Sequence, residues 1–341
     1  MTAAEIDALP APDETPLKIS RAGDMLSRPP PDWLIYQVLP RQSLGLIYGP
    51  TRSGKSFLGL DLAHHLALGR PWFGRPVDNK AGILYLAAEA PGGLSNRIKA
   101  WWQHHGIGPA DFCPIFCCEH AIDLRDERIV DDFEKTWAAW ANQWDLVIVD
   151  TLSCAIPGAD ENSAEAMSVV VQRMNSLRDC MNAAILLIHH TPKGDKTTPR
   201  GSGVLEAGVD MSIQVDRTGD IRTATIRKQR EGEEGPLGTF RLRQIETGLD
   251  DRARPITSCV VEQTDAPIEA VADNLTPSEK TYLTILQEAQ PNGLTLDEWN
   301  AQARDIDLCK GQKQRLYDLR VSLKRKHRVH TSMDRWYVTT R

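Results

Sequence analysis

The segment Gly49–Ser56 restricts the possible folds of this chain more than any other, and it reads Gly-Pro-Thr-Arg-Ser-Gly-Lys-Ser. Glycines in such a loop let backbone N–H groups close around phosphate oxygens, while the lysine reaches the β- and γ-phosphates and the serine ligates Mg²⁺. An apolar run, Ser43–Tyr48, precedes the loop and a helical pattern, Phe57–Leu68, follows it. This order favours a nucleotide site over a chance glycine-rich turn. We therefore expect ATP and Mg²⁺ to bind at Gly49, Pro50, Thr51, Arg52, Ser53, Gly54, Lys55, Ser56 and Phe57.

Short apolar runs alternate with helical patterns on both sides of this loop. The apolar runs are Ser43–Tyr48, Gly82–Ala87, Leu146–Val149 and Ala184–Ile188. The helical patterns are Phe57–Leu68, Gly93–His104, Val130–Asn142 and Ala164–Met181. Apolar strands that alternate with helices predict an α/β fold, a parallel sheet with helices on both faces. Met211–Arg217 and Ile221–Lys228 predict an antiparallel hairpin added to that sheet.

The chain divides into four predicted segments. Residues 1–31 form a flexible Pro-rich tail, 32–261 the α/β domain, 262–275 an acidic linker and 276–341 a small C-terminal domain. In the last, Thr276-Pro277-Ser278-Glu279 has the spacing of a helix capping box with proline at the first helical position. Helical patterns at Ser278–Ala289, Leu296–Ala303 and Gln312–Lys326 and two strands, His327–Thr331 and Arg335–Thr339, predict a winged helix-turn-helix.

The charge of the chain is unevenly distributed. The 341 residues suit two domains, and 40 Lys+Arg against 46 Asp+Glu give a net charge of −6. Residues 276–341 hold twelve Lys+Arg and eight Asp+Glu, a net +4, so the remainder carries −10. No apolar run approaches a membrane span, and seven cysteines in a long chain suggest no disulfide framework. We expect a cytoplasmic protein with no membrane partner.

Ionisable residues follow three of the predicted strands. Asp150 ends the run Leu146–Val149, and we expect its strand to neighbour that of the phosphate loop, so that Asp150 and Ser56 hold Mg²⁺. Glu89 follows the second strand, where a carboxylate can polarise the attacking water; the alternative is a solvated loop acid. His189 and His190 end the fourth strand, and one of them could sense the γ-phosphate, unless the pair only satisfies loop carbonyls.

Together these residues resemble the RecA-like helicase superfamily, above all the RepA-type hexameric plasmid helicases and the AAA family ATPases of phages and mobile elements. DnaB-type replicative helicases are more distantly similar. The resemblance covers Trp33 to Val261. Its segments are Ser43–Phe57, Leu84–Glu89, Leu146–Leu152, Leu187–Gly194, Pro199–Leu205 and Ile226–Arg230.

The resemblance implies a role for several residues. Glu89 is similar in position to the family's catalytic glutamate, Asp150 to its Walker B aspartate and His190 to its polar sensor. Lys228 and Arg230 resemble a pair that DnaB-type enzymes insert into the ATP site of the neighbouring subunit; the alternative for Arg230 is a solvated charge at a strand end. The resemblance therefore implies self-association into a ring, with six subunits as in the family, and the catalytic set Lys55, Glu89, Asp150, His190, Lys228 and Arg230.

Two further stretches resemble loops that face DNA in the channel of such rings. Thr191–Ser202 is polar and locally basic, with Lys193, Lys196, Arg200 and Ser202 as candidate contacts to single-stranded DNA. Ser153–Ala164 is acidic, so a contact to a neighbouring subunit or a place beside Mg²⁺ is an equal alternative.

Cysteines and tryptophans suggest two other sites that we disfavour. Cys113, Cys117, Cys118 and His120 lie close together, but their spacing is unusual for zinc and Cys113–Glu119 has the pattern of a buried strand. Trp101, Trp102, Trp137 and Trp140 have helical spacings, which favour core and subunit packing over a base-stacking platform.

The sequence thus predicts an ATP-hydrolysing motor on DNA, most specifically a replicative helicase of a plasmid, phage or mobile element. A replication initiator or primase is a further candidate partner. The alternative is an ATP-dependent DNA-binding regulator or recombination mediator without unwinding activity. A non-enzymatic binder is disfavoured by Lys55, Ser56, Glu89 and Asp150. The C-terminal domain could bind either DNA or protein.

Overall fold

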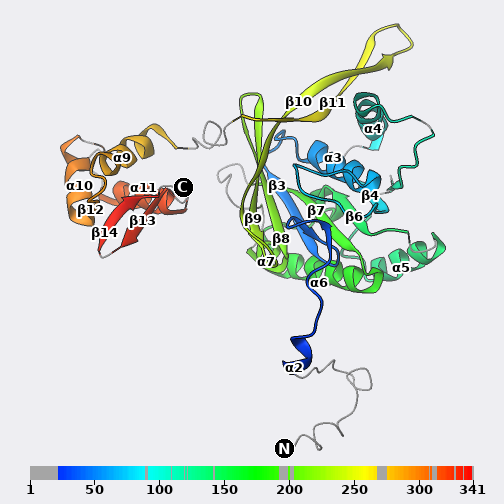
Figure 1. The fold of residues 1–341 in the computed structure, drawn as a ribbon, viewed down its shortest axis with the longest axis horizontal. Helices are drawn as coiled ribbons and strands as arrows, with labels where there is room; N and C mark the ends of the chain where they lie inside the picture. Colours follow the sequence, from blue (N-terminus) through cyan, green and yellow to red (C-terminus); the bar gives the residue numbers. More distant parts are fainter. Residues whose placement is uncertain are drawn as a thin grey trace, which may run out of the picture. The chain divides into compact units, whose positions relative to one another are not determined.

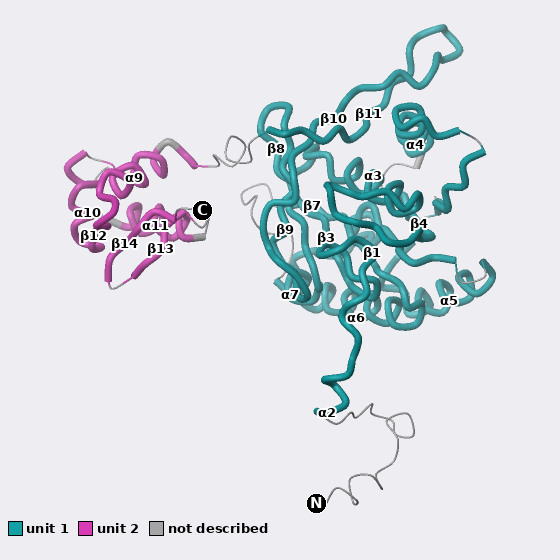
Figure 2. Tube along the Cα trace, in the orientation of Figure 1, with its two compact units in different colours: residues 1–268 teal, residues 269–341 magenta. Residues whose placement is uncertain are grey.

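The computed structural model comprises two compact units, residues 1–268 and 269–341 (Figure 2). It describes residues 22–88, 91–108, 110–118, 120, 122–140, 143–191, 199, 203–266, 275–306, 308, 313–325, 328–332 and 334–339. Of the predicted tail, residues 1–21 lie outside this set, and helix α2 (Ala22–Met25) lies within the remainder. No helix in the described part of the chain is long and apolar enough to cross a membrane.

A nine-stranded sheet organises the first unit (Figure 1). Its order is β11-β10-β9-β8-β3-β7-β6-β4-β5, in which the strands from β8 to β5 are parallel and β9, β10 and β11 are antiparallel. The strands are β3 (Leu44–Gly49), β4 (Ile83–Ala87), β5 (Ile115–Cys118), β6 (Leu146–Asp150), β7 (Ala184–His190), β8 (Met211–Thr218), β9 (Ile221–Gln229), β10 (Gly235–Leu249) and β11 (Pro255–Thr264). A separate pair, β1 (Trp33–Ile35) and β2 (Leu39–Pro40), precedes them.

The strand order corrects one expectation. The strand that ends in Asp150, β6, does not neighbour the phosphate-loop strand β3, because β7 lies between them and pairs with both. Apolar runs mark where strands are but carry no information about which strands pair. The antiparallel hairpin of β8 and β9 is present as expected, with β8 added to the other side of β3.

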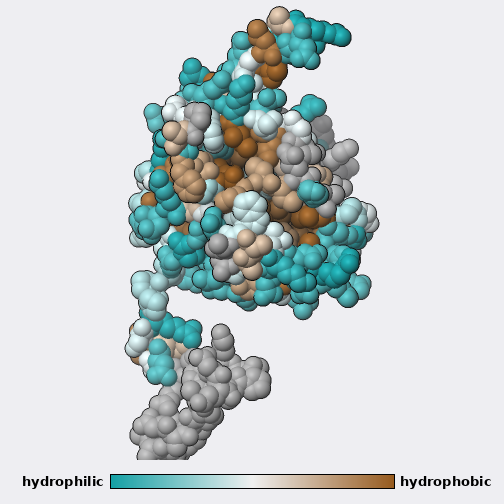
Figure 3. All heavy atoms as spheres, turned by 90° about the vertical axis from the view of Figure 1, so that its right-hand side faces the viewer, coloured by the Kyte–Doolittle hydropathy of each residue, from teal (hydrophilic) through white to brown (hydrophobic). Residues whose placement is uncertain are grey.

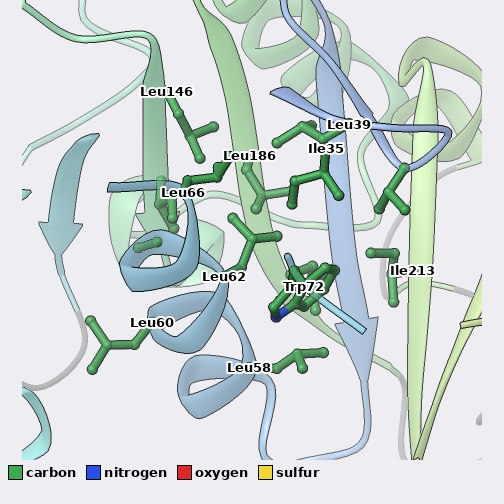
Figure 4. Packing of buried hydrophobic residues seen from close by; sticks show 14 of the residues in the cluster. Ile35, Leu39, Leu58, Leu60, Leu62, Leu66, Trp72, Leu146, Leu186 and Ile213 are labelled. Atoms are coloured by element: carbon green, nitrogen blue, oxygen red, sulfur yellow. The ribbon is translucent and has the colours of Figure 1, made fainter. Parts of the chain in front are cut away.

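Helices cover both faces of the sheet. On one face lie α3 (Lys55–Leu68) and α4 (Pro91–His105); on the other lie α5 (Ile129–Ala139), α6 (Ala164–Met181) and α7 (Gly203–Gly208). A short 3₁₀ helix, η2 (Leu152–Ala155), follows β6. The central strands are buried on both faces, which explains their continuous apolar sequences. Figure 4 shows Leu58 and Leu62 of α3 beside Trp72 in the layer between helix and sheet.

The tryptophans divide between the core and the surface. The buried carboxylate of Asp61 on α3 accepts hydrogen bonds from Trp72 Nε1 (2.9 Å) and Trp101 Nε1 (2.8 Å). Trp101 is also stacked on His64 and His105. Trp140, by contrast, is 51% exposed, so it does not pack in the core, and of the expected roles only a contact to a neighbouring subunit applies to it. It follows the last turn of α5, where its ring contacts Phe116 and Trp144.

Strands β10 and β11 form a long hairpin that the strand pattern of the sequence did not reveal. They pair from Thr239–Thr264 to Leu249–Pro255, and β11 thereby passes the predicted domain end at Val261 into the predicted linker. Phe240-Arg241-Leu242-Arg243 alternates as a half-buried strand does, but register shifts at Pro236/Gly238 and at Glu246/Gly248 break the alternation on either side of it. Val260 packs with Ala100 and Trp101 of α4, so the hairpin extends the core over that helix.

The opposite edge of the sheet is formed by β5. Its side chains are half-buried and Cys117 is exposed, so the expectation of a buried strand is only partly right. Apolar residues gather in the middle of the face seen in Figure 3. A cavity of about 660 Å³ opens between β4, β5 and α5, lined in part by Leu86, Phe116 and Phe133.

The described residues of the second unit form three helices and a three-stranded antiparallel sheet of order β12-β14-β13. In chain order these are α9 (Pro277–Glu288), β12 (Leu294–Thr295), α10 (Leu296–Asp305), α11 (Lys313–Arg325), β13 (Val329–Ser332) and β14 (Arg335–Val338). The predicted capping box is present, because Thr276 accepts from the Glu279 backbone N–H and the Glu279 carboxylate accepts from the Thr276 N–H. Tyr282 and Trp299 stack in the core with ring centroids 4.0 Å apart.

Candidate nucleotide-binding site

The phosphate loop connects the end of β3 to the start of α3. Gly54 caps the helix with φ 99°, a left-handed conformation that glycine adopts without strain. A Cβ atom on Gly49 would stand 2.2 Å from the Val215 carbonyl oxygen, so only glycine fits beside β8 at this point. The loop residues therefore present backbone N–H groups at the N-terminus of α3, the arrangement that binds phosphate.

Lys55 extends across this loop. Its Nζ donates to the Pro50 carbonyl (2.9 Å) and lies 3.1 Å from His190 Nδ1, and the residue is only 4% exposed. The structure thus brings Lys55 and His190 together at the ends of two neighbouring strands, which pair as far as Gly49–His190. His189 is buried and lies instead 3.5 Å from Ser153 Oγ, at the start of η2. Of the two histidines, His190 is the one that lies beside the phosphate loop.

Asp150 is held on both of its carboxylate oxygens. One accepts a hydrogen bond from Ser56 Oγ (2.8 Å) and the other from the hydroxyl of Tyr85 (2.7 Å). Burial, followed by the charge of Asp150 and this hydrogen bond, raises the pKa of Tyr85 well above its usual value, so the phenol remains a donor. Ser56 of α3 and Asp150 of β6 are therefore adjacent, although β7 separates β6 from β3, the strand that leads into α3. Sequence reasoning missed Tyr85, because a tyrosine inside the apolar run of β4 resembles a core residue.

Phe57 lies at the first turn of α3, after the phosphate loop. Its ring is partly buried, and the guanidinium of Arg97 on α4 lies 5.1 Å from the ring centroid. This contact joins α4 to the helix that carries Lys55 and Ser56.

Several predicted site residues lie outside the described part of the chain. These are Glu89, Lys193, Lys196, Arg200 and Ser202. The flanking residues are described: Ala87 pairs with Asp150, and the Ala88 N–H donates to the Asp150 carbonyl (2.9 Å). Strand β7 ends at His190, directly before residues 192–198.

Lys228 and Arg230 lie far from the phosphate loop of their own chain. Strand β9 runs antiparallel to β8, so its last residues return to the edge where β3 begins, the edge opposite to Gly49. There Lys228 Nζ donates to the carbonyls of Glu206 (2.8 Å) and Ala207 (2.9 Å). Arg230, which is 52% exposed at its side chain, pairs with Asp210 at 2.7 Å. Burial, followed by the charge of Arg230, lowers the pKa of Lys228.

The residues at the loop fit a nucleotide with Mg²⁺. The hydroxyls of Ser53 and Thr151 are buried and have no hydrogen-bond partner among the described residues. Buried polar atoms usually have a partner, and here Ser53 lies in the phosphate loop while Thr151 directly follows β6. Within those residues no group of three His, Cys, Asp or Glu side chains is arranged to hold a metal ion by itself. Mg²⁺ is commonly held by one carboxylate, a hydroxyl and the phosphates, a set that Asp150 and Ser56 supply.

The cysteine cluster has its own environment. Cys113 is half-buried, and burial raises its pKa to about 11, which disfavours the thiolate that binds metal. Cys117 is exposed on β5.

The phosphate loop on β3, the aspartate two strands away and the antiparallel extension beyond β8 define the class of this protein, a RecA-like P-loop ATPase. A family model described as an AAA domain, AAA_25, matches residues 11–196. The chain belongs to this family.

Among solved structures, the crystal structure of the RadB recombinase is 19% identical, covers 59% of this chain and 88% of its own, and has a TM-score of 0.44. No curated protein matches the chain.

Proposed function

We propose that this protein is an ATP-hydrolysing motor that acts on DNA, of the kind represented by the RepA-type replicative helicases. One observation carries the proposal. His190 lies against Lys55 at the last residue of β7, and from there the chain continues into Thr191–Ser202, which holds Lys193, Lys196 and Arg200. A change at the γ-phosphate therefore acts directly on the base of a basic segment. This connection couples hydrolysis to a DNA-contacting loop.

Each residue at the site has a defined task in this proposal. Lys55 and the loop N–H groups bind the β- and γ-phosphates, and Ser56 and Asp150 would hold Mg²⁺, which neutralises charge on the phosphates when bound. Tyr85 keeps Asp150 in place through its hydrogen bond. Glu89 accepts a proton from the attacking water, and His190 contacts the γ-phosphate beside Lys55.

Self-association is part of the same proposal. Lys228 and Arg230 lie at the edge of the sheet opposite to Gly49, which suits residues that reach the ATP site of a neighbouring copy rather than their own. An arginine supplied in trans stabilises charge in the transition state and makes hydrolysis depend on assembly. We propose a ring, with six subunits as in the related helicases.

The second unit is proposed to be a winged helix that binds duplex DNA. Its order of helix, strand, two helices and two strands is that of a winged helix-turn-helix, in which the third helix enters the major groove. Among the described residues of α11, the exposed side chains are Gln314, Tyr317, Asp318, Val321 and Lys324, a polar face with one acid, one base and an aromatic ring. The net charge of +4 over residues 276–341 favours DNA over a protein partner.

The alternative function is an ATP-dependent regulator or recombination mediator that binds DNA without unwinding it. Both functions use the same ATP-site residues, so an activity must separate them. The decisive experiment is strand displacement on a duplex with a single-stranded tail, with ATP and Mg²⁺, beside light scattering to detect a ring.

The motor predicts ATP-dependent displacement by a ring, and hydrolysis stimulated by single-stranded DNA. Lys55→Ala should abolish both activities, because its ammonium group is the one cation of the loop that reaches the β- and γ-phosphates. Hydrolysis without displacement would favour the alternative, and full hydrolysis by the Lys55→Ala protein would contradict both.

A further inference from the structure

A second cation lies behind the phosphate loop, at the end of β9 opposite to Lys228. Arg222 is the second residue of β9, and it is 7% exposed. A Cβ atom built on Gly54 would lie 3.7 Å from Arg222 Nε, beside the rings and methyl groups of Phe240 (3.5 Å) and Leu242 (3.6 Å). The guanidinium therefore stands at the N-terminus of α3, enclosed by β10.

The charge of Arg222 is poorly compensated in this position. One terminal nitrogen donates to the Asp220 carbonyl (2.6 Å), whereas Nε is buried with no hydrogen-bond partner. Within the described ranges, no carboxylate forms an ion pair with it. Burial, followed by the charge of Arg217, lowers the pKa of Arg222, against the opposing charges of Asp220 and Cys259.

Neighbouring groups add further positive charge around Arg222. The N-terminus of a helix carries partial positive charge, so a lone guanidinium there is unfavourable. Arg217, which pairs with Arg222 across β8 and β9, is a second cation close by. A buried arginine without a paired carboxylate and close to other positive charge requires a bound anion to neutralise it. The anion that this loop is built to bind is a phosphate chain.

We infer that Arg222 is a nucleotide-binding residue that contacts the phosphate chain of ATP from the β9 side of the loop. The inference rests on the ATPase assigned to the site and deepens it. Lys55 approaches the phosphates from within α3 and Arg222 approaches from the antiparallel strands, so the nucleotide is held between the two parts of the sheet. The partners of Arg222 are phosphate oxygens and not the base, because a guanidinium pairs with phosphate through parallel N–H donors.

The test is isothermal titration of ATP, ADP and adenosine into the full chain, with thermal denaturation of the nucleotide-free protein. Variants are Arg222→Met, which keeps the bulk and removes the charge, and Arg222→Lys, which keeps the charge and loses the planar donors. The matched control is Arg217→Met, which removes the exposed cation directly opposite on β8; its Nε donates only to the Gly219 carbonyl.

We expect the Kd for ATP and ADP to rise at least tenfold in Arg222→Met and about threefold in Arg222→Lys, with Arg217→Met within twofold of wild type. The Kd for adenosine should not change. The nucleotide-free Arg222→Met protein should melt no lower than wild type, because an uncompensated buried charge has been removed.

A Kd for ATP within twofold of wild type in either folded Arg222 variant overturns the inference. So does a lower melting temperature with unchanged Kd, which is the signature of a purely structural cation. A different result would contradict the proposed motor function. Wild-type protein that binds ATP but shows neither DNA-stimulated hydrolysis nor strand displacement is not a motor, whereas the role of Arg222 in nucleotide binding would still hold.

Discussion

At the scale of single residues, the active site depends on side chains that fix other side chains. Asp150 uses both oxygens to accept hydrogen bonds, one from Ser56 and one from Tyr85. If Ser56 and Asp150 hold Mg²⁺ as proposed, Tyr85 is the donor that would still fix the carboxylate. Tyr85 is buried and its pKa is raised well above its usual value, so its hydroxyl stays protonated, and a donor, at neutral pH.

Tyr85→Phe should therefore impair Mg²⁺-dependent ATP hydrolysis more than it impairs nucleotide binding. Hydrogen bonds to charged groups contribute about 1.5–3 kcal/mol, so we expect kcat to fall by about tenfold or more. The Mg²⁺ concentration for half-maximal hydrolysis should rise, while the Kd for ATP without Mg²⁺ stays unchanged. Tyr36→Phe, at an exposed tyrosine of the same unit, is the control. An unaltered Mg²⁺ dependence in Tyr85→Phe would show that Asp150 needs no second donor.

The site residues that the sequence predicted differ from those it did not predict in what determines their positions. Lys55 and Ser56 belong to a local pattern in which spacing alone determines geometry, and Asp150 stands out as a charge at the end of an apolar run. Tyr85 and Arg222 owe their positions to the strand order and to the hairpin of β10. Their neighbours are distant in sequence, so no local pattern contains them.

At the scale of elements, helix ends were the most predictable features. The Thr276–Glu279 capping box is present as expected, and Glu279 also accepts from Ser322 Oγ of α11. A second capping box, Thr295 with Glu298 at the start of α10, has the same spacing and was overlooked. The central strands begin and end within two residues of their apolar runs. Strands β10 and β11 were not predicted because glycines and register shifts at Pro236/Gly238 and Glu246/Gly248 interrupt the alternation of β10.

Thr276→Ala should destabilise α9 within the full chain. Loss of an N-cap side chain costs about 1 kcal/mol, so amide exchange across Pro277–Glu288 should accelerate by about fivefold. Thr284→Ala is the matched control, because Thr284 lies in the exposed interior of α9, where alanine favours the helix. Hydrogen exchange with mass spectrometry measures both proteins. Equal exchange rates in the two variants would mean that the cap contributes nothing.

At the scale of the whole molecule, net charge is misleading because the two units differ in sign. The value of −6 combines about −10 over the ATPase part with +4 over residues 276–341. Lys228 and Arg230 stand at the sheet edge opposite to Lys55, so if they act at an ATP site as proposed, that site belongs to a neighbouring copy. The proposed ring brings these edges together.

Mixing of inactive subunits tests the ring directly. Arg230→Ala and Glu89→Gln proteins should each hydrolyse ATP at least tenfold slower than wild type. Their mixture should regain activity, because some interfaces combine an intact Glu89 with an intact Arg230 from the neighbour. A mixture of Lys55→Ala and Glu89→Gln is the control, since both changes fall on the same side of the interface. No gain in the first mixture over this control would exclude an arginine supplied in trans.

The central position of β3 also governs when the nucleotide site can form as the chain is synthesised. Both neighbours of β3 in the sheet come much later in the sequence, since Leu44 pairs with Ile185 in β7 and Gly45 with Met211 in β8. A nascent chain that ends before β7 holds the phosphate loop on an unpaired apolar strand. Such pairings over long sequence separations form slowly and leave strand edges exposed. Truncated products that end before residue 184 should therefore be prone to aggregation and to chaperone binding, although they contain the complete loop and Asp150.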